Sequence, residues 1–328
     1  MQEAIETREL IMLDGPDGDI RGTYHRPNEG SFYPRSLPIA PGRIGVLFLN
    51  STSPTRAQNG DAAVYLADSF ASCGYPSFRL DLPGFGDSQG EPPADMVGFI
   101  NRGAYASIAS AKARELVARF NLSGVVFAGH CAGAVSALYA AAASSECRGI
   151  ILIGPYFHLP LARKPSKIQQ DLTVWAMKSQ LGKLFHKCYG ALRKARSNLR
   201  WSSLPENANS ALLCCWKNRA SSGMPILMLT APERKGSGMN PRKAEFDYLK
   251  YALKIAGRES RVVLGVTDGA NNAFANSLGR EAVRRQSEQW LKSCFPLGVS
   301  EALDTDSVCG EPEKTTSEHE NHEQYLKV

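Results

Sequence analysis

The segment VVFAGHCAG, residues 125–133, joins a continuous apolar run to a stretch of small residues. The run Val125–Ala128 is typical of a buried parallel strand, and Cys131–Ala143 predicts a helix of small residues. Glycines stand two positions before and two positions after Cys131. This spacing is typical of a sharp strand-to-helix turn, because only glycine leaves room for the backbone on either side of the presented residue. The sequence therefore predicts a nucleophile elbow with Cys131 as the nucleophile.

A helix that begins at this turn aims its first amides at the Cys131 thiol. The N–H of Ala132 is then placed to bind an oxyanion that develops on a substrate. The same helix end favours negative charge on the sulfur. A buried structural cysteine in a glycine-rich turn is the alternative that the five residues alone leave open.

Strand and helix patterns alternate outward from the elbow, and repeated strand–helix units predict a mainly parallel sheet with helices on both faces. The expected strands are Glu9–Leu13 and Ile20–Arg26 as a hairpin, then Gly45–Leu49, Pro76–Asp81, Val125–Ala128, Gly149–Ile153, Ile226–Leu229 and Arg261–Val266. The expected helices are Ala62–Cys73, Ile100–Phe120, Cys131–Ala143, one near Pro241–Ile255, and Arg280–Lys292.

The alternation is interrupted once, which divides the chain into three parts. We expect residues 1–155 and 225–295 to form the core, 156–224 a helical cap and 296–328 a disordered tail, because the first gap is too long for a simple loop and the tail is polar. The cap is basic, with ten Lys or Arg and one acid between His158 and Trp201, while the tail holds eight acids and two lysines. The basic cap could recruit an anionic partner, although a solvated helical face gives the same pattern.

A second signature, DLPGFGDS at residues 81–88, follows a predicted strand one unit before the elbow. The chain resembles the α/β-hydrolase superfamily over residues 8–293. The segments that carry the resemblance are VLFLNS at 46–51, GYPSFRLD at 74–81 and GHCAG at 129–133. More narrowly, the chain is similar to hydrolases associated with bacterial exosortase loci. The resemblance implies the α/β-hydrolase fold and an oxyanion donor at Ser51 or Thr52. It also implies an acid after the strand ending at Leu229 and a histidine after the strand ending at Val266.

The chain departs from this family at the last two positions. Asn272 stands where the histidine is expected, and asparagine cannot act as a general base. Ala231-Pro232-Glu233-Arg234 stands where an aspartate is expected, so Glu233 is the candidate acid. Among the six histidines, His158 is the candidate substitute base, because it follows a strand at the sheet edge where ligand sites form. A surface or structural histidine is the competing interpretation.

A cysteine nucleophile tolerates the loss of a histidine better than serine does, because some thiolate exists without a base. Losing the histidine still removes the acid that protonates a leaving group. Thioesters need that acid least, since thiolates leave readily. The sequence therefore favours a small-molecule ester or thioester substrate, either free or attached to a carrier.

Two hypotheses about function remain open. The chain is either an esterase, thioesterase or acyltransferase that uses Cys131, or a degenerate relative that acts as a binding or scaffold protein. No phosphate loop, metal cluster or dinucleotide motif occurs, so we expect no cofactor, and no module predicts nucleic-acid binding. No apolar run is long enough for a membrane span. Scattered cysteines and an acidic N-terminus favour a reduced, cytoplasmic protein.

Overall fold

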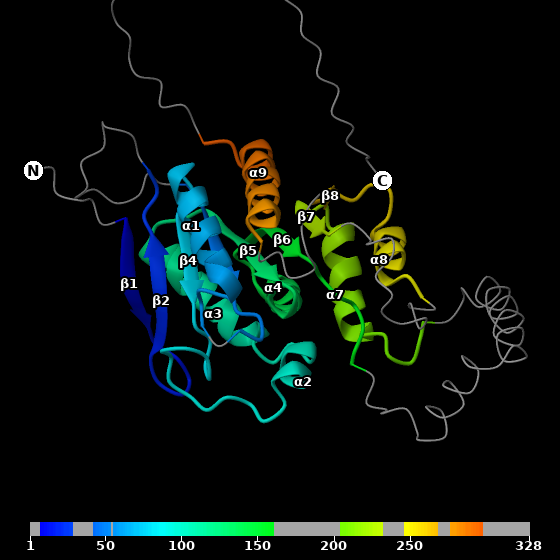
Figure 1. Ribbon diagram of the computed structural model, residues 1–328, viewed down its shortest axis with the longest axis horizontal. Coiled ribbons are helices and arrows are strands. Elements are labelled where there is room, and N and C mark those ends of the chain that lie inside the picture. The colour runs from blue at the N-terminus through cyan, green and yellow to red at the C-terminus, as the bar shows by residue number, and fades with distance from the viewer. Residues whose placement is uncertain are drawn as a thin grey trace, which may run out of the picture.

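The computed structural model describes residues 7–28, 42–53, 55–160, 204–231, 246–267 and 276–297. Within these residues, eight strands form one sheet in the order β1-β2-β4-β3-β5-β6-β7-β8 (Figure 1). The strands are β1 (Arg8–Leu13), β2 (Ile20–His25), β3 (Ile44–Leu49), β4 (Ser77–Leu80), β5 (Gly124–His130), β6 (Cys147–Ile153), β7 (Ile226–Thr230) and β8 (Val262–Val266).

The sheet is parallel from β4 to β8 and antiparallel at its N-terminal edge. β1 pairs with β2 as the expected hairpin, and β2 pairs antiparallel with β4. β3 and β5 are buried along almost their whole length, as their continuous apolar sequences predict for strands covered on both faces. Because parallel strands end at the same edge, β3, β5, β6 and β7 bring their following loops together. The predicted α/β architecture is confirmed.

Helices cover both faces of the sheet (Figure 1). One core cluster places α1 (Ala62–Ser72) and α9 (Ser277–Cys294) against one face, and a short 3₁₀ helix, η1 (Asn59–Asp61), leads into α1. A second cluster on the other face contains α2 (Met96–Asn101), α3 (Ala106–Arg119), α4 (Ala132–Ala143), α7 (Ser210–Ser221) and α8 (Tyr248–Ala256). Nearly every residue of α4 is buried, which its run of alanines allows because small side chains let the sheet and neighbouring helices approach closely.

The single helix expected over Ile100–Phe120 is wrong. The structure has α2 and α3 instead, separated by a turn in which Gly103 has a φ of 72°. A Cβ atom at Gly103 would lie 2.7 Å from the ring of Tyr139, so the turn needs glycine for both its conformation and its packing. The helical periodicity before and after Gly103 did not reveal this break, because the break is caused by packing against Tyr139 in α4.

Helix α7 falls within the range where the sequence predicts a cap, yet it packs into the core. Its Trp216 is fully buried, contacts the ring of Phe157, and donates a hydrogen bond to the carbonyl of Ala252 in α8 (2.7 Å). We therefore assign α7 to the helical layer that covers α4. The basic segment from 161 to 203 and the tail from 298 lie outside the described residues.

Candidate active site

The predicted turn is present between β5 and α4. Cys131 joins them with a φ of 54° and a ψ of −114°, which is a strained conformation for a residue other than glycine. Its N–H donates to the carbonyl of Ile153 in β6 (2.8 Å), and its own carbonyl accepts from the N–H of Ala134 (3.0 Å). Hydrogen bonds to the sheet and to the helix thus stabilise the strained backbone conformation. The residue remains exposed to solvent.

The glycines on either side of Cys131 are required by close backbone contacts. A Cβ atom at Gly129 would lie 2.1 Å from the carbonyl oxygen of Gly133, and one at Gly133 would lie 2.7 Å from the carbonyl oxygen of Leu49. The first contact closes the turn, and the second brings the loop after β3 against the start of α4. The sequence spacing therefore has the steric origin that we expected.

The N-terminus of α4 and the loop after β3 meet at this turn. Among the described residues, no side chain caps the N-terminus of α4 and no acidic residue lies in its first turn, so the positive end of the helix faces the turn. The loop after β3 supplies Ser51, which is buried, and Thr52, which is exposed. The Ser51 hydroxyl accepts from the N–H of Ser53 (3.1 Å), which folds the loop on itself. The loop after β3 thus leaves the sheet beside the start of α4, where a Cβ atom at Gly133 would also lie 3.1 Å from the carbonyl oxygen of Asn50. The role of Ser51 or Thr52 as an oxyanion donor stays a prediction.

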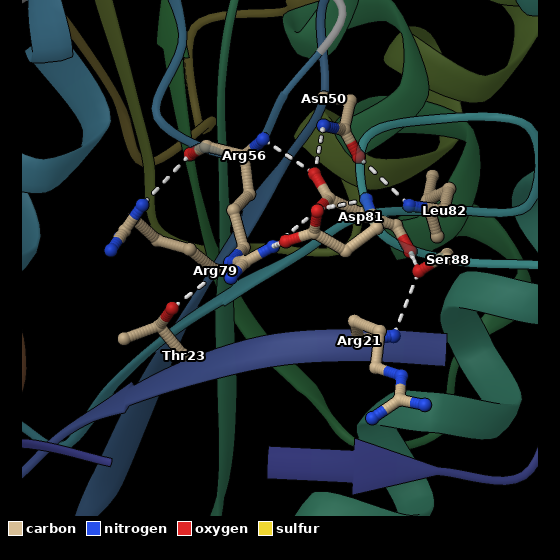
Figure 2. Close-up of polar contacts among 9 residues, drawn as sticks. Arg21, Thr23, Asn50, Arg56, Arg79, Asp81, Leu82 and Ser88 are labelled. Atoms are coloured by element: carbon tan, nitrogen blue, oxygen red, sulfur yellow. Dashed lines mark hydrogen bonds and ion pairs between the residues drawn. The ribbon is translucent and has the colours of Figure 1, made fainter. Parts of the chain in front are cut away.

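An ion pair that the sequence analysis missed holds this loop in place (Figure 2). Asp81, fully buried after β4, accepts hydrogen bonds from the backbone N–H and the guanidinium of Arg56 and from the N–H of Asp87 (3.2 Å). Asn50 also donates to Asp81 (3.5 Å), and its side-chain oxygen accepts from the N–H of Leu82 (3.0 Å). The DLPGFGDS signature therefore ends a strand and places the carboxylate that fixes the loop after β3.

A second set of polar side chains extends the network to β1 and β2. Arg79, buried beneath Arg56, donates to the Arg56 carbonyl (3.2 Å) and to Nε2 of His25 (2.8 Å). Nδ1 of His25 pairs with Asp68 (2.8 Å), which also binds Arg8. Because Arg79 can only donate, the His25 ring must accept at Nε2 and is neutral. Burial, followed by the charge of Arg79, lowers the pKa of His25 to about 4.

This histidine predicts acid sensitivity of the fold. The unfolded chain takes up a proton on His25 near pH 6.5, whereas the folded chain does so only near pH 4. The contribution of neutral His25 to the free energy of unfolding is therefore fully present above pH 6.5 and is lost as the pH falls from 6.5 to 4. We expect His25 alone to lower the free energy of unfolding by about 2 kcal/mol between pH 7 and pH 5. Urea denaturation of the wild type and of His25→Asn at pH 7 and pH 5 measures this change in the free energy of unfolding. The variant should lose that part of the pH dependence; an unchanged difference between pH 7 and pH 5 would contradict the assignment.

His158, the candidate base, lies just after β6 and is exposed. Its backbone bridges to Ala208, and its ring packs between Tyr156 (5.6 Å between ring centres) and Tyr248 (5.4 Å). The residue as a whole is exposed, but the two neighbouring aromatic rings shield part of the imidazole from water, and this desolvation lowers the pKa of His158, so the ring is neutral at neutral pH. Among the described residues, no hydrogen bond joins it to Cys131. Its role as a base therefore stays a prediction.

The other two candidates, Glu233 and Asn272, lie outside the described residues. A small, mostly apolar pocket lies beside the turn, between the sheet, α1 and α9, and is lined in part by Phe48, Leu66 and His130. Among the residues described, no cluster of His, Cys, Asp or Glu could hold a metal ion. No helix in that part of the chain is long and apolar enough to cross a membrane.

The strand order, the turn at Cys131 and the loop after β3 together identify the architecture. A family model described as the alpha/beta hydrolase fold matches residues 49–207. The chain has the α/β-hydrolase fold. No curated protein sequence matches this chain significantly.

Solved structures with the α/β-hydrolase fold align along most of the chain. Esterase Pf2001 of Pyrococcus furiosus is 14% identical, with a TM-score of 0.53 over 87% of this chain and 91% of the esterase. DcsB, solved with a substrate analogue, is 13% identical, with a TM-score of 0.54 over 88% of this chain and 99% of DcsB. A 2,6-dihydroxy-pseudo-oxynicotine hydrolase is 15% identical, with a TM-score of 0.50 over 88% of this chain and 68% of the hydrolase. These low identities establish the fold and leave the chemistry to the residues.

Proposed function

We propose that this α/β-hydrolase-fold protein is a hydrolase or acyltransferase that acts on a small ester or thioester through an acyl intermediate on Cys131. The observation that supports it is an exposed thiol on a strained, positive-φ residue at the start of a helix. Strain at a single exposed residue, held by hydrogen bonds on both sides, is typical of a functional site. The fold accommodates such chemistry, since the similar structures include an esterase and a hydrolase.

The proposed reaction has two steps. The Cys131 thiolate attacks the acyl carbon, and the N–H of Ala132 with that of Ser51 or Thr52 stabilises the oxyanion. The leaving group departs, and water or an acceptor then attacks the thioacyl intermediate and releases the thiolate.

The finer assignments follow from the sequence. Asn272 in place of a histidine favours thioesters, whose leaving group needs no acid. The basic segment between His158 and Trp201 would attract an acidic carrier protein. His158 and Glu233 are the residues available for proton transfer. The similarity to exosortase-associated hydrolases suggests a role at such a locus, and the scattered cysteines suggest a cytoplasmic protein.

A scaffold function is the second candidate, because Asn272 cannot serve as a base. Mass spectrometry distinguishes the two. We expect incubation with para-nitrophenyl butyrate, or with a butyryl thioester of a small thiol, to add one butyryl group to the peptide that contains Cys131. Cys131→Ala should remove the adduct, and Cys214→Ser, which changes an exposed thiol on α7, should keep it. Wild-type protein without any adduct would favour the scaffold.

A further inference from the structure

A tyrosine and a buried amide lie at the same sheet edge as the proposed nucleophile. Tyr156 follows the end of β6 by three residues, and the last residue of β6, Ile153, accepts the hydrogen bond from the N–H of Cys131. The ring of Tyr156 packs on that of His158, which fixes its orientation. Tyr156 is therefore held close to the turn by the strand next to β5.

Asn101 lies close to Tyr156, and its side-chain amide is buried. Only 4% of this residue is exposed, and neither polar atom of its side chain has a hydrogen-bond partner among the described residues. Its backbone carbonyl is held by the hydroxyl of Tyr139 (2.9 Å) and by Nδ2 of Asn209 (2.9 Å). Because an unsatisfied buried amide costs about 1–3 kcal/mol, a rigidly held one indicates a polar partner in the working site.

The pKa of the Tyr156 hydroxyl depends on Cys131 and on Asn101. Burial raises the pKa of Tyr156, the negative charge of Cys131 raises it further, and the amide of Asn101 lowers it. The hydroxyl is therefore protonated at neutral pH, and a thiolate at Cys131 strengthens this state. It can donate a proton to a group more basic than a phenolate.

We propose that Tyr156 is the general acid that protonates a leaving alkoxide, so that the site accepts alkyl oxygen esters as well as thioesters. This inference rests on the proposed Cys131 chemistry. An oxygen ester needs such an acid, because the tetrahedral intermediate otherwise expels the better leaving group, which is the Cys131 thiolate. With a donor in place, the bond to the leaving oxygen breaks as that oxygen takes the proton of Tyr156.

The second step restores the proton. The oxygen of a water molecule bonds to the acyl carbon, the Tyr156 phenolate takes a proton from that water, and the bond to the Cys131 sulfur breaks. The carboxylic acid leaves, and the thiolate and the tyrosine hydroxyl are both regenerated. No oxidant, metal or further reactant is needed.

Leaving-group dependence tests this role. Para-nitrophenol leaves as an anion without help, whereas ethanol does not, so para-nitrophenyl butyrate and ethyl butyrate differ in their need for an acid while they share an acyl group. We expect Tyr156→Phe to lower kcat/KM for ethyl butyrate by about 100-fold and to leave that for para-nitrophenyl butyrate within about threefold. Tyr248→Phe is the matched control, since Tyr248 contacts the same His158 ring and its hydroxyl donates to Asn207 (2.7 Å).

Four outcomes would overturn the role of Tyr156. An equal loss for both esters would show a structural effect, an equal change in Tyr248→Phe would show a general effect of this aromatic cluster, and a wild type inactive on ethyl butyrate would show that no acid is present. The butyryl adduct on Cys131 is followed in the same samples. Its absence in the wild type overturns the proposed function itself, whereas its presence with an unchanged leaving-group dependence overturns Tyr156 alone.

Discussion

Cys131→Ser is expected to lose about as much activity as Cys131→Ala, at least roughly 1,000-fold in kcat/KM for a thioester. In a serine hydrolase with an intact triad the hydroxyl would be the natural nucleophile. In the part of the chain that the structure describes, the hydroxyl would have no hydrogen-bonded base, since no hydrogen bond joins His158 to residue 131, and asparagine stands at position 272. Only a thiol supplies a useful anion at neutral pH without a partner.

The measurement is steady-state hydrolysis of one butyryl thioester by wild type, Cys131→Ser and Cys131→Ala. Cys214→Ser and the wild type should have the same activity, which excludes a general effect of losing an exposed thiol. A Cys131→Ser variant within about tenfold of the wild type would reveal a functional base near the turn. His158→Gln in that background would then tell whether His158 is that base.

The elbow could be predicted from sequence because backbone sterics determine it locally. Gly129 and Gly133 are fixed by contacts at 2.1 and 2.7 Å that any residue with a Cβ would violate, so the pattern around Cys131 reports the geometry directly. The parallel sheet followed from apolar runs such as Val46–Leu49, which have one stable environment. In both cases the information lies within a few consecutive residues.

Other parts of the site depend on contacts between distant residues. Arg56 and Asp81 are 25 positions apart, and nothing in the loop sequence around Arg56 marks it as the partner of a buried carboxylate. Tyr156 and Asn101 come close to each other because β6 and α2 pack against the same helix, α4. The break at Gly103 has the same origin, since the ring of Tyr139 in α4 excludes a side chain there.

Asp81→Asn is expected to lower the free energy of unfolding by about 3 kcal/mol and to lower kcat more than it changes KM. The substitution keeps the shape of the side chain but replaces one acceptor oxygen by a donor nitrogen. That nitrogen would face the N–H and guanidinium of Arg56 or the amide of Asn50, all of which donate to Asp81 in the native protein. The guanidinium, only 15% exposed, would lose its buried counter-charge.

The rate should fall because the same contacts hold the loop with Ser51 and Thr52 against the turn. A displaced amide donor costs about 100-fold or more in kcat where it binds an oxyanion. Asp87→Asn is the matched control, because Asp87 also pairs with Arg56 (2.8 Å) but its side chain is 71% exposed. Exposed pairs contribute less than about 1 kcal/mol, so this variant should be nearly silent in urea denaturation and in kcat.

Arg56→Gln, alone and combined with Asp81→Asn, completes a double-mutant cycle. If the ion pair holds the loop, the double variant should lose much less than the sum of the two single losses, because removing either partner already breaks the same contact. Additive losses in both stability and kcat would contradict the coupling. A loss of stability in Asp81→Asn with an unchanged kcat would show that the buried pair stabilises β4 without positioning the amides. The loop after β3 would then have to be held by Gln58, whose side chain donates to the carbonyl of Leu49 (3.1 Å).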